Sequence, residues 1–150
     1  MTSQDGIEII VSALILNESS EILLVRQPDK WGDLWTLPGG HLMPGELLQA
    51  GAQREGTEET GLDLAPVGLA SFGELFQHRP SGARVHFIYF DFVFRAVTTT
   101  LKLERSEISE GRWVSPHDVL SYQLTDGYRD TLTKFLGRGG TSLPAPSTVY

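Results

Sequence analysis

Apolar residues in this chain gather in short β-branched and aromatic runs, which are separated by polar turns and by longer segments of mixed character. Such runs, typical of β-strands, occupy residues 7–16, 21–27, 66–77, 84–97 and 111–116. The first two are joined by the polar turn NESS and predict a hairpin, and the run RVHFIYFDFVFRAV carries the strongest strand signal. The pattern therefore predicts a sheet built from several strands.

Two other segments have helical character. Residues 46–60 consist largely of helix-forming residues, and Gly61 is well placed to end the helix in the left-handed conformation. Residues 125–137 predict a closing amphipathic helix with these apolar side chains on one side: Tyr128, Leu132 and Phe135 or Leu136.

A further helix start is predicted at Ser115. This residue is placed as an N-cap, with Pro116 in the first helical position and Asp118 three residues after the cap, as in a capping box. The segment 28–46 contains four glycines and three prolines, so we predict a long ordered loop with at most a short strand at 34–37.

Strands come first, a helix interrupts them, more strands follow, and a helix closes the chain. This order predicts an α+β or α/β domain, in which helices lie on the faces of a mixed sheet. We assign residues 1–137 to this single domain and residues 138–150, rich in Gly, Pro and Ser, to a C-terminal tail.

The composition narrows the class of protein. A chain of 150 residues without cysteine has no disulfides and no thiolate metal ligands, and its formal net charge of −7 argues against nucleic-acid polymers as partners. The N-terminus has no signal-peptide pattern, and no apolar stretch approaches the roughly 20 residues of a membrane helix. We therefore expect a cytoplasmic protein, and the sequence leaves open whether it forms a homodimer.

Three carboxylates gather near the end of the first predicted helix. At about 100° per residue, Glu55, Glu58 and Glu59 fall within an arc of about 100°, which brings several oxygens around one point. Mg²⁺ prefers such hard oxygen ligands. The alternative is a solvated helix face stabilised by an Arg54–Glu58 ion pair one turn apart.

The spacing of the residues around these carboxylates favours the metal site. It resembles the Nudix box, G-x5-E-x7-R-E-U-x-E-E-x-G-U, in which U is a bulky apolar residue. All seven fixed identities are present: Gly40, Glu46, Arg54, Glu55, Glu58, Glu59 and Gly61. Leu62 fills the last U position, but Gly56 occupies the first, so the packing beneath the helix departs from the pattern.

The resemblance implies the Nudix fold, an α/β/α sandwich around a mixed β-sheet. It also implies a Mg²⁺-dependent hydrolase, with Mn²⁺ as the other candidate ion, that cleaves a nucleoside diphosphate linked to another moiety by attack of water at phosphorus. By similarity, the metal ligands are the Gly40 carbonyl and the carboxylates of Glu55, Glu58 and Glu59. Arg54 would orient Glu55, and Glu46 would hold the loop to the helix.

The resemblance leaves the general base open, because members of the family use either a glutamate of the box or one on a loop before the last strand. The candidate within the box is Glu55. The loop LERSEISEGRWV offers Glu104, Glu107 and Glu110, of which Glu107, six residues before Trp113, fits best. A base on a mobile loop would reach the attacking water only when substrate is present.

The substrate is less well defined by the sequence. Candidate substrate-binding residues are Arg26, Trp31, Arg79 and Arg84. Trp31 would stack on a base or anchor the loop, and the arginines would bind phosphate or lie in solvent. The stretch FGELFQHRPSGAR has no Tyr after the box, and Pro80 lies a couple of residues beyond the place associated with ADP-ribose. Nucleotide sugars, ADP-ribose-like compounds and nucleoside triphosphates therefore all stay open.

The rival function is a non-catalytic Nudix-fold module that senses a nucleotide or binds a partner. Such modules usually lose box carboxylates or are fused to a DNA-binding domain. The intact carboxylates of this chain favour an enzyme that acts on a small nucleotide.

Overall fold

A computed structural model of the chain describes residues 6–78 and 81–138. Within these residues, seven strands form one sheet: β1 (Ile7–Leu16), β2 (Ile22–Arg26), β3 (Trp35–Thr36), β4 (Gly39–His41), β5 (Leu64–His78), β6 (Arg84–Ala96) and β7 (Glu110–Val114). The helices are α1 (Pro28–Trp31), α2 (Leu48–Thr60) and α3 (Asp126–Gly137), with a short 3-10 helix at Val119–Ser121.

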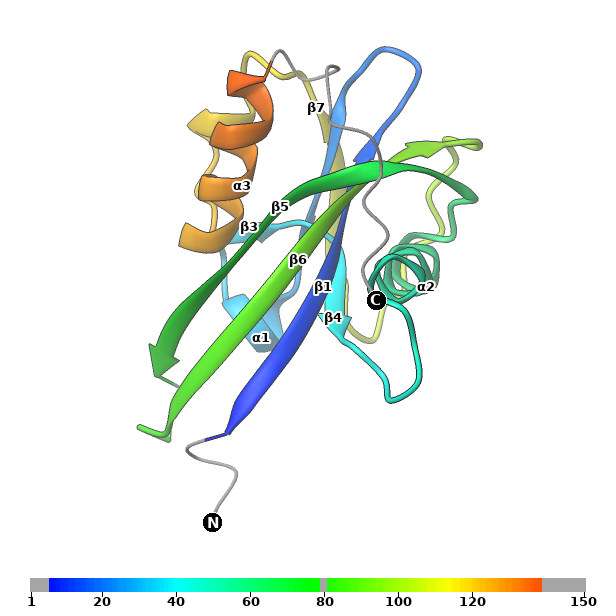
Figure 1. Cartoon of the computed structure of the whole chain (residues 1–150). Coiled ribbons are helices and arrows are strands. Elements are labelled where there is room, and N and C mark those ends of the chain that lie inside the picture. Colours follow the sequence, from blue (N-terminus) through cyan, green and yellow to red (C-terminus); the bar gives the residue numbers. More distant parts are fainter. Residues whose placement is uncertain (1–5, 79–80, 139–150) are drawn as a thin grey trace.

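The sheet is mixed. Its strand order is β3-β2-β1-β6-β5, with β4 paired to β1 and β7 paired to β2. The central strands β1 and β6 run parallel over ten register pairs, whereas the other pairs of strands are antiparallel. Figure 1 shows the long strands β1, β5 and β6 crossing the molecule side by side, with α2 and α3 on opposite sides of the sheet.

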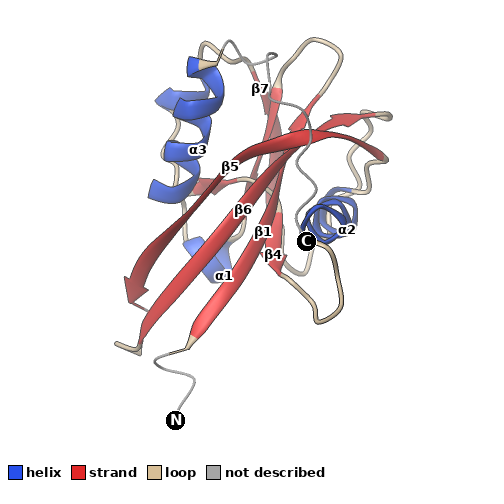
Figure 2. Ribbon diagram, viewed as in Figure 1, coloured by secondary structure: helices blue, strands red, loops and turns tan. Residues whose placement is uncertain are grey.

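Each face of the sheet buries its own hydrophobic cluster. Along β1, Val11, Ala13 and Ile15 point to the face that α2 covers, whereas Leu14 and Leu16 point to the face that α3 covers. This alternation follows from the two-residue period of a strand. The two helices therefore enclose the strands between them, as Figure 2 shows, and the expected sandwich around a mixed sheet is confirmed.

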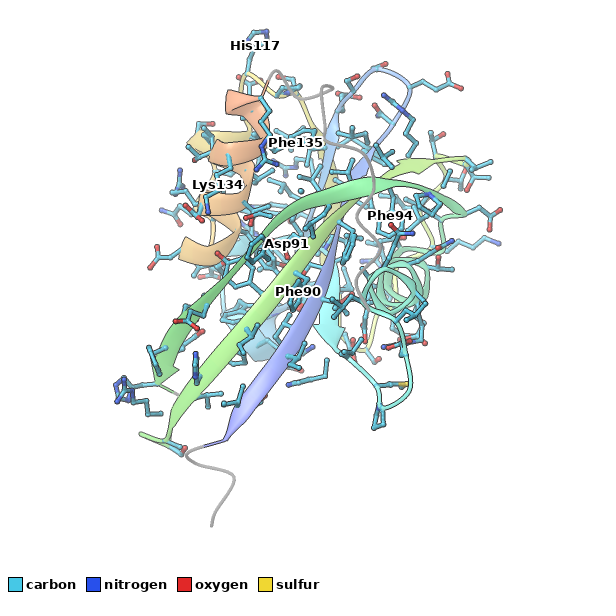
Figure 3. The ribbon with its side chains drawn as sticks, viewed as in Figure 1. Phe90, Asp91, Phe94, His117, Lys134 and Phe135 are labelled. Carbon is cyan, nitrogen blue, oxygen red and sulfur yellow. The ribbon has the colours of Figure 1, made fainter. Side chains whose placement is uncertain are left out.

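Most predicted elements are confirmed. The hairpin of β1 and β2, the helix α2 with Gly61 in the left-handed conformation (φ 72°), and the closing helix α3 all form. Leu132 and Phe135 of α3 are buried against the sheet, and Figure 3 shows Phe135 on the side of α3 that faces the strands.

Two predictions about local structure were wrong. The segment 28–46 holds the short helix α1 and the strand β4 in addition to β3, because its glycines 39 and 40 pair with β1 and its Pro28 begins a helical turn. The capping box at Ser115 does not start an α-helix: the Ser115 carbonyl accepts hydrogen bonds from the amides of Asp118 and Val119, and a 3-10 turn follows. His117, beside this turn, is exposed and projects from the end of the molecule in Figure 3.

Residues 1–5, 79–80 and 139–150 lie outside the described residues, so the tail assigned to 138–150 is described only at Arg138. The Arg138 guanidinium donates a hydrogen bond to the Ala70 carbonyl of β5 at 2.6 Å. In the described part of the chain, every helix is too short or too polar to cross a membrane.

Candidate active site

Helix α2 approaches the sheet through small residues. Its buried residues are Gly51, Ala52, Gly56, Glu59 and Thr60. A Cβ atom on Gly56 would lie 2.8 Å from Leu64 Cδ1 and 3.1 Å from Ala13 Cβ, closer than well-packed side chains approach. The glycine that departs from the expected pattern therefore lets the helix lie close to the strands.

Arg54 joins the loop after β4 to the helix. Its Nε and Nη2 donate to the two carboxylate oxygens of Glu46 at 2.6 and 3.0 Å, and Nη2 also reaches the His41 carbonyl at 3.2 Å. Its Nη1 donates to Glu55 at 2.9 Å and to Glu58 at 3.2 Å. The hydrogen bonds from Arg54 lower the pKa of Glu46 to about 2. The guanidinium thus fixes the loop against the helix and draws Glu55 and Glu58 together.

Glu59 is the buried carboxylate of the helix, with 1% of its surface exposed. Its Oε1 accepts a hydrogen bond from Gln27 Nε2 at 2.7 Å, but its buried Oε2 has no hydrogen-bond partner among the described residues. Burial, together with the charge of Glu55, raises the pKa of Glu59 to about 9. An unpaired carboxylate oxygen in such a place favours binding of a cation.

An acidic cleft opens beside these residues. It has a volume of about 320 Å³ and is lined by Glu58, Glu59, Glu104, Ser106 and Glu107. The Glu104 amide donates to the Glu59 carbonyl at 3.0 Å, which fixes the segment after β6 against the end of α2. We call this space the acidic cleft.

The three glutamates proposed as alternative bases differ in their partners. Glu104 accepts hydrogen bonds from the Ser106 hydroxyl and amide, and Glu110 pairs with Arg112 at 2.8 Å. No side-chain hydrogen bond or ion pair joins Glu107 to another described residue. Of these glutamates, Glu107 therefore has the carboxylate that is both in the acidic cleft and uncommitted.

The donor set fits a divalent cation, although no three acidic or histidine side chains in the described residues are already grouped around one point. The reason is that Arg54 holds Glu55 and Glu58 while Gln27 holds Glu59. The Oε2 of Glu59 has no hydrogen-bond partner among the described residues, and three further glutamates line the cleft beside it. These oxygens are therefore available to a bound cation. Hard oxygen donors of this kind suit Mg²⁺ or Mn²⁺.

A larger and mostly apolar pocket lies on the other face of the sheet. It has a volume of about 420 Å³, and its lining residues come from α1, from β1, β5 and β6, and from the start of α3. Trp31, Tyr89 and Tyr128 supply aromatic walls, and Asp126 supplies a carboxylate. We call this space the apolar pocket; its size and polarity suit a flat heterocycle.

The strand β4 lies between Glu55 of α2 and Ser12 of β1. A Cβ atom on Gly40 would lie 2.6 Å from the Glu55 carboxyl carbon, whereas a Cβ atom on Gly39 would collide with the Ser12 hydroxyl on the opposite face. Ser12 in turn hydrogen-bonds to Tyr128 of the apolar pocket at 2.7 Å. The two adjacent glycines therefore bring the carboxylates of α2 and the pocket wall close together across a thin strand.

Comparison with known proteins assigns the family. A family model described as the NUDIX domain matches residues 7–135. The chain belongs to the Nudix hydrolase family. It is 33% identical over 114 residues to Nudix hydrolase 5 of Arabidopsis thaliana, a match that covers 74% of this chain and 37% of that protein.

Two bacterial Nudix relatives and one solved structure add to the comparison. The putative 8-oxo-dGTP diphosphatase of Bacillus subtilis is 50% identical over 52 residues, 35% of this chain and 34% of that protein. Nucleoside triphosphatase NudI of Escherichia coli is 28% identical over 131 residues, 82% and 92% of the two chains. The crystal structure of the MutT protein from Methanosarcina mazei Go1 has a TM-score of 0.71 at 32% identity and covers 92% and 98%.

The lengths of these Nudix proteins differ. The chain spans little more than a third of Nudix hydrolase 5 and of the Bacillus subtilis protein, but nearly all of NudI and of the Methanosarcina mazei protein.

The predicted substrate-binding residues of this Nudix chain lie in different places. Trp31 lines the apolar pocket, whereas Trp35 belongs to the core. Arg26 lies over the Trp35 ring, 4.4 Å from its centroid, and pairs with Glu110 at 3.5 Å, so it lines neither space.

Arg84, the first residue of β6, does not line the acidic cleft. Arg84 lies over the ring of Phe76, 4.2 Å from its centroid, at the far end of the sheet. Arg79 lies outside the described residues.

Sequence reasoning missed Gln27, which holds Glu59, and Tyr128, which it assigned only to the core side of α3. Gln27 directly follows the charged Arg26 at the end of β2, and nothing in the sequence shows that its side chain is buried, although it is 3% exposed. Tyr128 follows the glycine in the helix start TDGY, and that glycine opens space for the pocket.

Proposed function

We propose that this Nudix chain is a metal-dependent pyrophosphohydrolase of nucleoside triphosphates, which releases a nucleoside monophosphate and pyrophosphate. The observation that carries the proposal is the presence, in one domain, of an acidic cleft beside α2 and an apolar pocket beside the start of α3. A nucleoside triphosphate has both matching parts, a flat base and a polyphosphate that requires cations.

The acidic cleft would take the polyphosphate. The Gly40 carbonyl, Glu55, Glu58 and Glu59 would hold Mg²⁺ or Mn²⁺. When bound, such ions neutralise charge that develops on the phosphates and promote attack by water. The chain carries a formal charge of −7, so without cations it would repel its substrate.

The residues of the chain have separate roles in this proposal. Arg54 positions Glu55 and the loop through its bonds to Glu46. Glu107, uncommitted at the rim of the acidic cleft, would accept a proton from the attacking water, and Glu55 is the alternative base. Trp31 and Tyr128 would contact the base in the apolar pocket.

The relatives favour nucleoside triphosphates among the Nudix substrates. The match to NudI extends over most of both chains, and the match to the putative 8-oxo-dGTP diphosphatase is 50% identical where it aligns. An oxidised purine nucleotide is therefore included among the candidates, beside the ordinary nucleoside triphosphates.

A substrate screen tests the proposal. Purified protein is incubated with ATP, dGTP, 8-oxo-dGTP, ADP-ribose and a nucleotide sugar, with Mg²⁺, with Mn²⁺ or with EDTA, and the products are identified by chromatography. We expect a monophosphate and pyrophosphate from at least one triphosphate, and no product in EDTA. If only ADP-ribose or the nucleotide sugar is hydrolysed, nucleoside triphosphates are the wrong substrate class and nucleoside diphosphate derivatives are the right one. Binding without hydrolysis would indicate the non-catalytic module.

Melting temperature provides a second measurement on the same protein. A cation that binds only the folded chain raises the melting temperature as its concentration increases. We expect a rise with Mg²⁺ up to about 10–20 mM that disappears in Glu59→Gln. Absence of both the shift and activity would leave the carboxylates as a charged surface.

A further inference from the structure

Asp91 is a buried carboxyl group in the aromatic-rich strand β6. It lies in the middle of β6, is 0% exposed, and is flanked by Phe90 and Phe92. Its side chain points to the face of the sheet that α3 covers, where it bonds to Thr131, and Figure 3 labels it on the strands beside that helix. Burying a carboxyl group without a cation is unfavourable, and no ion pair in the described residues involves Asp91. Its presence there therefore needs a reason other than packing.

Polar contacts join this carboxyl and its neighbours to α3. Thr131 donates a hydrogen bond from Oγ1 to Asp91 Oδ2 at 2.6 Å. Ser12, the register partner of Asp91 on β1, bonds to the Tyr128 hydroxyl at 2.7 Å. Tyr128 and Thr131 are three residues apart, so they project from the same side of α3. The second carboxyl oxygen, Oδ1, and the hydroxyl of Ser71, the partner on β5, are buried without a bond.

These contacts lie at the end of α3 that forms the apolar pocket. Tyr128 lines the pocket together with Asp126 and Gly127, and the apolar anchors Leu132 and Phe135 lie further along the helix. Hydrogen bonds are directional, whereas apolar packing tolerates sliding and rotation. Hydrogen bonds therefore help to hold the first turns of α3: Thr131 and Tyr128 bond to Asp91 and Ser12, and Arg129 donates to the carbonyls of Leu120 and Tyr122.

We propose that Asp91 is a positioning residue for substrate binding, which acts through Thr131 to hold the α3 wall of the apolar pocket beside the Ser12–Tyr128 hydrogen bond. The proposal rests on the proposed function, because it assumes that the pocket receives the base of the substrate. Its consequence is specific: weakening the contact should lower affinity for the nucleoside part and leave the chemistry at the acidic cleft unchanged.

The raised pKa of Asp91 indicates that its ionised form lowers the stability of the fold. Burial raises the pKa of Asp91 to about 7, against the opposing effect of the Thr131 and Ser12 hydroxyls. Of the titratable groups around it, Asp130 raises this pKa further, while Asp91 itself raises the pKa of Tyr89 and Tyr128. Asp130 is paired with Lys134 at 2.8 Å and so is partly neutralised.

The first experiment separates binding from chemistry. Thr131→Val removes the hydroxyl that donates to Asp91 with little change in volume, and Thr131→Ser keeps a hydroxyl. Thr133→Val is the control, because it makes the same Thr-to-Val substitution on the exposed side of the helix. We expect Thr131→Val to raise KM about three- to tenfold with kcat within twofold of wild type. Thr131→Ser and Thr133→Val should have wild-type KM.

Binding without catalysis supplies a readout that does not need activity. Trp31 lines the apolar pocket, so tryptophan fluorescence is titrated with dGMP and with 8-oxo-dGMP in EDTA. The Kd should rise in Thr131→Val by the same factor as KM. If Thr131→Val does not fold, Thr131→Ala, which removes the same hydroxyl and adds no new group beside Asp91, is measured in its place.

A second experiment isolates the carboxyl group. An acid whose pKa is higher in the folded than in the unfolded chain makes folding less favourable as the pH rises between those two values. For Asp91 this range extends from 3.8 to about 7. Asp91→Asn cannot ionise, so its melting temperature relative to wild type should increase from pH 5 to pH 8. Because both proteins share all other titratable groups, the effects of those groups cancel in the difference between the two melting temperatures.

The outcomes distinguish the inference from the proposed function. Equal KM and Kd in folded Thr131→Val and Thr131→Ser would overturn the positioning role even if wild type hydrolyses nucleotides. A pH-independent difference in melting temperature for Asp91→Asn would overturn the buried ionisable carboxyl. Binding of either monophosphate without any triphosphate hydrolysis would overturn the proposed function alone, and the Kd series would still decide the role of Asp91.

Discussion

The two long helices cover the same sheet in opposite ways. Helix α2 buries small residues and one carboxylate, and a glycine stands where it meets β1 and Leu64. Helix α3 buries Thr131, Leu132 and Phe135, so large apolar side chains fill the space between it and the strands. The close approach of α2 brings carboxylates beside β4, whereas the side-chain contacts of α3 supply burial of apolar surface.

We infer from this difference that the α3 face of the sheet contributes mainly to stability, and that the α2 face carries the candidate catalytic groups. Apolar burial stabilises α3 by roughly 25 cal/mol per Å², while α2 is joined to its loop by the hydrogen bonds of Arg54 to Glu46, Glu55 and Glu58. Changes to the carboxylates of α2 should therefore alter hydrolysis more than folding, and changes to the large buried side chains of α3 should do the reverse. Four predictions, made with five substitutions, test this division and the close packing of α2.

The largest effect is expected for Glu58→Gln and Glu59→Gln. Each removes one carboxylate of the acidic cleft without changing its size, so nearly all hydrolysis should be lost. Without metal, the melting temperature of Glu58→Gln should stay close to wild type, and that of Glu59→Gln should not fall below it, because Glu59 is a buried acid with a raised pKa. Steady-state kinetics and thermal unfolding measure the two quantities, with Glu18→Gln in the distant first turn as the control. Retention of more than about a tenth of kcat/KM, a loss under ~1.4 kcal/mol, would contradict the metal role.

Glu107→Gln should have the next largest effect if this residue is the general base. The expected decrease in kcat is roughly 10²–10⁴-fold, the usual size of general-base catalysis, with little change in KM or melting temperature. Glu104→Gln, in the same segment but bonded to Ser106, is the matched control. Near-wild-type activity in Glu107→Gln together with an inactive Glu55→Gln would assign the base to the box.

Phe135→Ala tests the opposite face. Removing a fully buried aromatic ring typically lowers the free energy of unfolding by about 3–5 kcal/mol, and Phe135 is 1% exposed. Denaturant unfolding should show this loss, while kcat of the folded fraction should stay near wild type. Lys134→Ala, on the exposed side of α3, should change the free energy of unfolding by less than about 1 kcal/mol. A large fall in kcat at an unchanged melting temperature would break the division.

Gly56→Leu should have the smallest of the four effects, a loss of about 1–3 kcal/mol from overpacking. The new side chain would have to displace Leu64 or lift α2 away from β1. Gly56→Ala should give a smaller loss, and Thr57→Leu, one residue on at an exposed position, should leave the melting temperature near wild type. An unchanged or raised melting temperature in Gly56→Leu would mean that the helix is not close-packed there.

Local signals predicted much of this fold. The apolar runs became strands, and the glycine after the Nudix box became the left-handed end of α2, because period and turn chemistry act over a few residues. The strand β4 was missed because its glycines have no side-chain pattern, and only their pairing with β1 makes them a strand. The parallel pairing of β1 with β6 likewise depends on segments far apart in the sequence.

For the candidate site, the sequence predicted mainly the residues that belong to the Nudix box. The spacing named Gly40, Arg54 and the box glutamates, but not Gln27 or the place of Arg26, which lies over Trp35. Those positions depend on how the sheet folds, and a single sequence does not encode them locally. Asp91 did leave a signal: it is the one charged residue within the run FIYFDFVF.

The guanidinium of Arg54 also has a consequence for the protein before any ion arrives. One nitrogen, Nη1, bonds to both Glu55 and Glu58, so a positive group already occupies part of the place where a metal would be held. If the proposed metal site is right, loading would exchange one cation for another, and the arginine would release Glu58 while it keeps Glu46. In the absence of metal, the guanidinium offsets the repulsion between the carboxylates of Glu55 and Glu58.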